Sequence, residues 1–314
     1  MRFATLAPSS HNTQPWQFSV GWDHVELFAD RARQLRVSDP DGRELVISCG
    51  AALMNFRVAC HRFGRESAIT LLPDPEEPDL LAWAGCGASI SASTEDVRLF
   101  EALPHRRTTR VPFKRRNVPD ALLRRLMTAA EREGARLVPL QGEAARKQLA
   151  EVVDGATREQ FQNRRFRAEL AAWMRGSARL DGIPPQSLGL GPLRGRLAPW
   201  VVRTFDLGGA QASRDRAVAH SAPLVVVLAT DRDTRAHWLR AGQALERILL
   251  AAADEGVSAS YLNTPVQLPA WRSELAAIAV EEGAPQIVVG FGYAPHKPWP
   301  TPRRPLAHVT RPLA

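Results

Sequence analysis

The residue types best suited to chemistry lie near the start of the chain, in the run Pro8-Ser9-Ser10-His11-Asn12-Thr13-Gln14-Pro15-Trp16. Each proline lacks a backbone N–H donor and fixes its φ at about −65°, so the run is expected to form a rigid loop. Hydroxyl and amide side chains in such a loop present several hydrogen-bond donors and acceptors at defined positions. This pattern is suited to a flat heterocycle with an alternating hydrogen-bonding edge, such as a flavin. A purely structural loop is the alternative.

A second chemically distinctive segment follows much later in the chain. Arg106-Arg107-Thr108-Thr109-Arg110 carries three guanidinium groups and two hydroxyls within five residues. Arginine binds phosphate through paired hydrogen bonds, so the segment predicts a phosphate cradle. Taken alone, a solvated basic turn before a helix is the simpler interpretation. Its occurrence together with the polar loop favours the cradle.

The two segments together resemble the signatures of the nitroreductase family. Residues 8–16 match every fixed position of the family's flavin-contacting pattern Pro-Ser-x-x-Asn-x-Gln-Pro-Trp. Residues 106–110 are similar to its Arg-Arg-Ser-x-Arg segment, with Thr108 in place of serine. The resemblance extends over nearly the whole chain and is nearest to the Acg-like branch, in which two nitroreductase-like halves share one chain. It implies FMN as the cofactor, with the arginine segment on the phosphate and the ribityl chain.

The order of the two segments is reversed relative to a single nitroreductase, where the arginine segment comes first. In nitroreductase dimers each flavin lies between subunits and contacts the arginines of one and the polar loop of the other. This chain has one segment of each kind, in opposite halves. The resemblance therefore implies one intact flavin site and one lost site.

Two further segments are similar to flavin-contacting parts of the family. Arg303 and Arg304, within Pro302-Arg303-Arg304-Pro305, match basic residues that close on the phosphate. The segment 263–267 matches the family segment whose backbone N–H approaches flavin N5, and Gln267 stands where an acidic residue is usual. The resemblance thus assigns cofactor binding to Pro8, Ser9, Ser10, Asn12, Gln14, Arg106, Arg107, Thr108, Arg110, Pro265, Val266, Gln267, Arg303 and Arg304.

An internal repeat suggests how two halves could arise. Residues 50–64 and 242–256 have glycine, alanine, leucine, alanine and a closing glycine at the same offsets, and both windows have helical periodicity. Coincidence between two buried helices rich in small residues is the alternative. With the resemblance, the repeat predicts an α+β, nitroreductase-like fold that forms an internal pseudo-dimer of two mixed-sheet halves. Residues 1–95 would be a truncated first half and residues 96–314 the second.

Apolar runs and proline content predict three further elements. The continuous apolar runs 224–228 and 286–290 are typical of strands buried on both faces. The proline-rich tail 294–314 is expected to extend over the surface. Residues 155–215 have no counterpart in a simple nitroreductase half. Because they combine aromatic residues, arginines and glycine hinges, they predict a lid-like insertion. A helical elaboration distant from the site is the alternative.

Composition limits the other function classes. The 314 residues are 45% hydrophobic and 24% charged, as in an ordinary soluble globular protein. No apolar run approaches the ~18 residues of a membrane helix, and no secretory signal is visible. Three cysteines and eight scattered histidines lack metal-ligand spacing, so no metal is expected. The cysteines indicate free thiols in a reducing compartment, which favours the cytoplasm.

The net charge of +8 raises nucleic acid as a partner. The arginines are spread along the chain without a nucleic-acid-binding motif, so no nucleic-acid partner is expected. A monomer, as an internal pseudo-dimer, or a weak homodimer is predicted.

These observations lead to one leading hypothesis and two alternatives. The first is an FMN-dependent oxidoreductase that passes hydride from NADPH or NADH to a nitroaromatic, a quinone or a similar small electron acceptor. Chemistry at the flavin requires no catalytic side chain. The first alternative is a silent protein that stores or sequesters FMN beneath its lid. The second alternative is a basic nucleic-acid binder, which would bind DNA with a steep salt dependence and hold no flavin.

Overall fold

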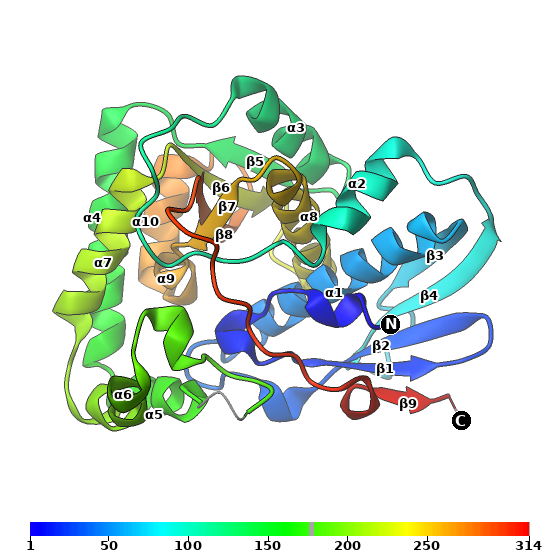
Figure 1. Ribbon diagram of the computed structural model, residues 1–314, viewed down its shortest axis with the longest axis horizontal. Coiled ribbons are helices and arrows are strands. Elements are labelled where there is room, and N and C mark those ends of the chain that lie inside the picture. The colour runs from blue at the N-terminus through cyan, green and yellow to red at the C-terminus, as the bar shows by residue number, and fades with distance from the viewer. Residues whose placement is uncertain (176–178, 314) are drawn as a thin grey trace.

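The computed structural model describes residues 1–175 and 179–313, which form two β-sheets with helices between and around them (Figure 1). The predicted α+β class is confirmed. In chain order the elements are η1 (Ala4–Leu6), η2 (Ser10–Asn12), β1 (Trp16–Val20), β2 (His24–Ala29), η3 (Arg31–Arg33), α1 (Arg43–Arg62), β3 (Arg65–Leu71), β4 (Leu80–Ser89), α2 (Thr94–Ala102), α3 (Asp120–Glu131), β5 (Arg136–Pro139), α4 (Glu143–Gln162), α5 (Arg164–Trp173), η4 (Pro185–Leu188), α6 (Pro192–Thr204), α7 (Gly208–Ser221), β6 (Leu224–Thr230), α8 (Arg235–Asp254), β7 (Ser258–Tyr261), α9 (Thr264–Gln267), α10 (Pro269–Ala279), β8 (Ala284–Gly292), η5 (Leu306–His308) and β9 (Thr310–Pro312), where η marks a short 3-10 turn.

The first sheet joins the two ends of the sequence. Its strand order is β3-β4-β2-β1-β9. β1 and β2 form an antiparallel hairpin, whereas β9 pairs parallel to β1, with Phe18 opposite Thr310. Figure 1 shows the tail running from the second sheet down to this edge. As predicted, the tail runs over the surface, since Val309 is the only buried residue among its described residues. Its last part forms β9, whose backbone satisfies the edge of β1.

The second sheet has the order β5-β6-β8-β7, with every strand pair antiparallel. An isolated parallel bridge between Thr108 and Ala259 extends it at the β7 edge. All seven residues of β6 are buried. Alternate residues of the strand enter different cores: Val226 packs toward α8, and Val225 packs toward α4 and α7. Burial on both faces explains the continuous apolar runs and confirms the predicted central strands.

The helices α1 and α8 contain the two repeat windows and cross each other between the sheets. A Cβ added at Gly50 would collide with the Leu239 carbonyl oxygen and lie 3.0 Å from Gly242 Cα. A Cβ added at Gly242 would collide with the Ile47 carbonyl oxygen and lie 2.8 Å from Gly50 Cα. Each glycine therefore contacts the glycine of the other helix and the residue three positions before that glycine. The contact is reciprocal, as at a two-fold interface.

The predicted insertion is largely helical. It runs from the second part of α4 through α5, η4 and α6 into α7. Residues 176–178 of the insertion, and residue 314 of the predicted second half, lie outside the described residues. In Figure 1, α4 and α7 lie side by side, and α5 and α6 lie at their lower end. The carboxylate of Glu169 on α5 accepts hydrogen bonds from Val37 N, Ser38 N and Ser38 Oγ at 2.9, 2.9 and 2.7 Å. The insertion is thereby fixed to the segment that leads into α1.

No helix among the described residues is long and apolar enough to span a bilayer. Within the same residues, no group of three or more histidine, cysteine or acidic side chains is arranged to hold a metal ion. Cys49, Cys60 and Cys86 are free thiols, as predicted.

Candidate functional site

Three distant segments meet at the first turn of the chain. The Leu6 carbonyl oxygen accepts a hydrogen bond from Arg106 Nη2 at 3.3 Å and from Arg303 Nη2 at 3.0 Å. Arg303 Nη2 also donates to the Ala7 carbonyl oxygen at 3.2 Å. The polar loop begins at the next residue. The structure therefore brings together the loop, the arginine segment and the tail that the sequence assigns to one site.

The polar loop has an unusual backbone. His11, Asn12 and Gln14 have φ values of 51°, 55° and 51°. Residues other than glycine rarely adopt this left-handed backbone conformation, and each one that does lowers the stability of the fold by on the order of 1 kcal/mol or more. Ser9 Oγ accepts a hydrogen bond from Gln14 N at 2.9 Å, which holds the turn closed. The loop follows Pro8 directly and leads into the buried Trp16 at the start of β1.

Two loop amides bind other parts of the protein. Asn12 Nδ2 donates to the Gly182 and Pro302 carbonyl oxygens, both at 3.1 Å, and Asn12 Oδ1 accepts from Arg303 Nη1 at 3.1 Å. Gln14 is fully buried; its Nε2 donates to the Leu180 carbonyl oxygen at 2.9 Å. These side chains position the insertion and the tail around the loop, a role that the sequence did not indicate.

Glu44 connects the loop to the segment that contains Gln267. Its carboxylate accepts hydrogen bonds from Ser10 Oγ at 2.5 Å and from Gln267 Nε2 at 2.9 and 3.0 Å. Gln160 Nε2, in the insertion, donates to Gln267 Oε1 at 2.7 Å. Glu44 is only 2% exposed and lies in the first turn of α1. Sequence reasoning missed it, although an acidic residue at a helix start after Gly42 is a visible signal.

The residues Pro265 and Val266 lie buried in α9, next to this network. Arg43 Nη2 donates to the Val266 carbonyl oxygen at 3.1 Å and lies 3.6 Å from Glu44. Asp39 accepts hydrogen bonds from the backbone N–H groups of Glu44 and Leu45 at the start of α1. Burial, and then the nearby charge of Glu44, raises the pKa of Asp39 to about 6.

The remaining residues of the arginine segment lie along the edge of the second sheet. Thr108 forms the bridge to Ala259, and Arg107 Nη1 donates to the Pro298 carbonyl oxygen at 3.3 Å. Arg110 is accessible to solvent, yet desolvation by the surrounding protein lowers its pKa. The positive charge of Arg110 also contributes to the lowered pKa of His11, for which burial is the main cause.

A buried polar cluster lies behind Arg106, and sequence reasoning did not find it. Glu246 on α8 is fully buried, with its Oε1 3.5 Å from Arg106 Nε. Burial raises the pKa of Glu246 to about 7, and the charges of Arg106 and Arg303 oppose this shift. Asn55 on α1 is also fully buried, and burial raises the pKa of Tyr261. The available signal was the position of Glu246, between Leu245 and Ile248-Leu249-Leu250 in the most apolar part of the helix.

Several buried polar atoms of these residues have no hydrogen-bond partner among the residues that the structure describes. They include both carboxylate oxygens of Glu246, Arg106 Nε, Arg303 Nε, His11 Nε2 and the Tyr261 hydroxyl. Buried polar groups in proteins are nearly always satisfied, so a concentration of unsatisfied ones indicates a place for a polar ligand or water. The concentration of arginines selects an anionic ligand.

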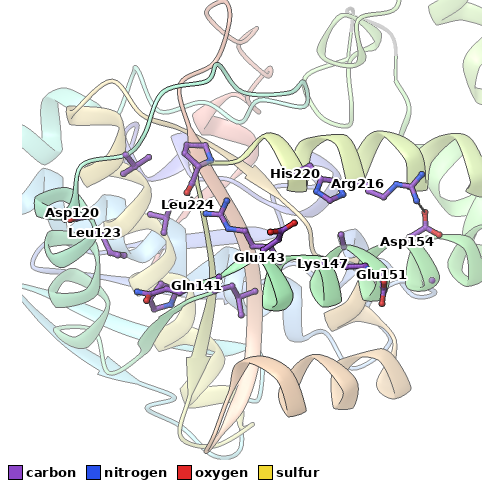
Figure 2. A pocket seen from close by; sticks show the side chains of 18 residues that line it. Asp120, Leu123, Gln141, Glu143, Lys147, Glu151, Asp154, Arg216, His220 and Leu224 are labelled. Atoms are coloured by element: carbon purple, nitrogen blue, oxygen red, sulfur yellow. Dashed lines mark hydrogen bonds and ion pairs between the residues drawn. The ribbon is translucent and has the colours of Figure 1, made fainter.

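A pocket that none of these residues lines is found elsewhere in the structure. It has a volume of about 1040 Å³ and lies among α3, α4, α7 and β6, and none of the predicted site residues lines it. Figure 2 shows its mixed charges, with Glu143, Lys147 and Glu151 along α4. Arg146 in its wall donates to the Ala222 and Pro223 carbonyl oxygens. Its charged side chains do not converge on one point.

Arg304 contacts the polar loop at Gln14. Its Nη1 donates to the Gln14 carbonyl oxygen at 3.1 Å and lies 3.4 Å from Asp30, and its Nη2 donates to the His308 carbonyl oxygen at 2.7 Å. It lines a separate cavity of about 480 Å³ together with Arg33, Arg179, Leu180, Asp181 and His308. These bonds hold the tail against the outer side of the loop.

Comparisons with known proteins point in one direction. The model of a family described as "Nitroreductase family" matches residues 103–293. The Mycobacterium tuberculosis protein named "Putative NAD(P)H nitroreductase acg" is 33% identical over 98% of this chain and 93% of its own length. "Putative NAD(P)H nitroreductase Rv3131" from the same organism is 32% identical over 98% and 89%. Among solved structures, the FMN-dependent nitroreductase NfnB from Mycobacterium smegmatis, in complex with NADPH, is 20% identical, with a TM-score of 0.46 over 68% of this chain and 98% of its own.

Proposed function

This chain belongs to the nitroreductase family, and from that membership we propose that it binds one FMN and reduces a small electron acceptor with NAD(P)H. The observation that carries the proposal is the convergence of Arg106 and Arg303 on the Leu6 carbonyl oxygen, beside the polar loop. Two guanidinium groups held together by one backbone acceptor repel each other, and an anion bound to both would relieve that repulsion. A phosphate supplies that anion.

The residues present fit FMN in charge and in hydrogen-bonding capacity. The phosphate would be held by Arg106, Arg107, Arg110 and Arg303. Two of these, Arg106 and Arg303, each have a buried Nε that has no hydrogen-bond partner among the described residues. The rigid loop and the α9 segment would orient the ring system. Bound FMN supplies the two-electron chemistry, accepting hydride from a nicotinamide and passing it to the acceptor. The protein's own contribution is orientation, electrostatics and exclusion of water.

We further propose that the chain consists of two fused nitroreductase-like halves, with the boundary near residue 95. The reciprocal contact of Gly50 and Gly242 at the crossing of α1 and α8 supports this proposal. The single FMN would then lie between the halves, with the loop from the first and the arginine segment from the second. Such a chain needs no second copy to complete its site, which is consistent with a monomer.

One experiment tests the function. The purified protein is inspected for flavin absorbance, loaded with FMN if necessary, and mixed with NADPH or NADH without oxygen. Bleaching of the flavin band, followed by its return on addition of a quinone, is the expected result. A protein that cannot be loaded with FMN contradicts the proposal. Salt-sensitive DNA binding by such a colourless protein would favour the nucleic-acid alternative.

A second function, storage of FMN beneath a lid, is favoured by one specific observation. The insertion is seated on the polar loop itself, because the Asn12 and Gln14 amides donate to the Gly182 and Leu180 carbonyl oxygens. Gly182 N also donates back to the Asn12 carbonyl oxygen at 3.2 Å. A seated insertion would restrict access of a nicotinamide to the flavin. A yellow protein that neither coenzyme bleaches, but that dithionite does, would support storage.

Opening the insertion is expected to speed FMN exchange. Glu169→Ala removes the acceptor of three hydrogen bonds from Val37 and Ser38, each worth about 1.5–3 kcal/mol when the acceptor is charged. We expect FMN to dissociate at least about tenfold faster, measured as recovery of free-flavin fluorescence after dilution. The control Glu151→Ala removes an exposed carboxylate from α4 and should leave the rate unchanged. An unchanged rate in Glu169→Ala would contradict the lid assignment.

A further inference from the structure

The buried cluster behind the arginines contains one ionisable group that the proposed function does not use. Glu246 lies on the face of α8 that points to the Arg106 side of the site, and its Oε1 is 3.5 Å from Arg106 Nε. The same Arg106 reaches the Leu6 carbonyl oxygen with Nη2, beside Arg303. One arginine therefore connects the buried carboxyl to the place proposed for the phosphate.

A negative charge on Glu246 is supported by Arg106, by the Asn55 side chain and by Arg303. The residue is fully buried, and neither carboxylate oxygen has a hydrogen-bond partner among the described residues. The groups that face it are Arg106 from the loop before α3, Arg303 from the tail, Tyr261 from β7 and the neutral Asn55 from α1. Without phosphate, the two arginines partly offset the cost of a buried carboxylate. A phosphate dianion on those arginines would withdraw that support and add repulsion.

We propose that Glu246 is a positioning residue that couples binding of the FMN phosphate to uptake of one proton by the protein. The inference rests on the proposed function, because the phosphate must come from FMN. With a proton, the Glu246 side chain is neutral and leaves Arg106 to the phosphate. Without the proton, the carboxylate competes with the phosphate for Arg106.

The direction of the pH dependence follows from linkage. The pKa of Glu246 is about 7 before FMN binds, and the nearby dianion can only raise it. FMN affinity is then highest at low pH and falls as the pH rises through that range. The phosphate has its own second pKa near ~6, and its ionisation would strengthen binding as the pH rises. The two effects have opposite signs.

Other groups near the site titrate outside the useful range or at its lower edge. Burial raises the pKa of Asp39 to about 6, so this carboxyl is largely ionised above pH ~6.5. The pKa of His11 is lowered, mainly by burial, so this side chain is largely neutral above pH ~6.5. Burial and the charge of Arg106 lower the pKa of Arg303 to about 9. Burial raises that of Tyr261. A window from about pH 6.5 to 8 therefore isolates Glu246.

The test measures the dissociation constant of FMN from the full-length protein across this window, by quenching of flavin fluorescence. We expect the constant to rise about fivefold between pH 6.5 and 8 in the native protein. Glu246→Gln, a neutral residue of the same shape, should bind FMN at least as tightly and with a flat profile. Glu274→Gln, at an exposed position on α10, should behave as the native protein does. Titration calorimetry in buffers of different ionisation enthalpy should show proton uptake that Glu246→Gln lacks.

The outcomes separate this inference from the function on which it rests. Tight FMN binding with a flat or rising affinity between pH 6.5 and 8 in the native protein would overturn the role of Glu246 and leave the proposed function intact. The same holds if Glu246→Gln keeps the native pH profile. A protein that binds no FMN at any pH would instead contradict the proposed function.

Discussion

Replacing Arg107 and Arg110 together by alanine is expected to release FMN. Neither side chain is part of the packed core, since Arg107 makes one hydrogen bond to a backbone carbonyl and Arg110 meets solvent. Hydrogen bonds to a charged partner contribute about 1.5–3 kcal/mol each, so losing two raises the dissociation constant by at least about 100-fold. Equilibrium dialysis, or fluorescence of flavin that passes an ultrafiltration membrane, measures the change.

A matched control separates the phosphate contact from a general loss of positive charge. Arg115→Ala with Arg124→Ala also removes two arginines, both exposed and both from the same part of the sequence. This variant should bind FMN within about twofold of the native protein, because exposed charges are screened by salt beyond ~10 Å. Equal losses of FMN affinity in the two double variants would indicate that the arginine segment acts only through its general positive charge. Unchanged FMN binding in the Arg107→Ala, Arg110→Ala variant would show that these two arginines do not contact FMN.

The second large effect is expected at the crossing of α1 and α8. Alanine in place of glycine inside a helix normally stabilises by about 1 kcal/mol. At Gly242 the added Cβ collides with the Ile47 carbonyl oxygen and lies 2.8 Å from Gly50 Cα. These are backbone atoms that cannot rotate away, so the two helices must separate. Gly242→Ala is therefore expected to destabilise by about 3 kcal/mol or more.

Urea unfolding, followed by circular dichroism, measures this effect as a lower midpoint at an unchanged slope. Gly191→Ala is the control, because its φ of −68° suits alanine and nothing lies within 4 Å of the added Cβ. Its stability should remain within about 0.5 kcal/mol of the native value. A Gly242→Ala protein as stable as the native one would show that the helices do not approach closely at this point. It would also remove the main support for fused halves.

The elements that the sequence predicted well have a periodic or compositional cause. β6 is an almost continuous apolar run and β8 is mostly apolar, and burial on both faces of the second sheet explains both patterns. The helices α1 and α8 were visible from their small and apolar residues at helical spacing. The approach of Arg106 to Leu6, just before residues 8–16, agrees with the family pattern, and no local property of either segment indicates it.

The details that the sequence could not predict depend on tertiary position. Asn12 and Gln14 matched the flavin pattern, but their amides bind the insertion and the tail, since those backbones carry carbonyls that need donors. In the sequence, Glu44 and Glu246 each stand beside an arginine in a helix. Their importance arises only from the burial and the neighbours that the fold gives them.

The hydrogen bond between Arg303 and the Leu6 carbonyl oxygen limits when, during protein synthesis, the proposed cofactor can bind. The two residues are 297 positions apart in the sequence. The paired strands β1 and β9 are separated by a similar length of chain. On a ribosome, the polar loop therefore emerges long before the arginine that completes its surroundings. A nascent chain stopped before residue 303 would display the loop and the arginine segment without their third component. Loading with FMN would accordingly follow synthesis, and the exposed edge of β1 would need protection in the interval.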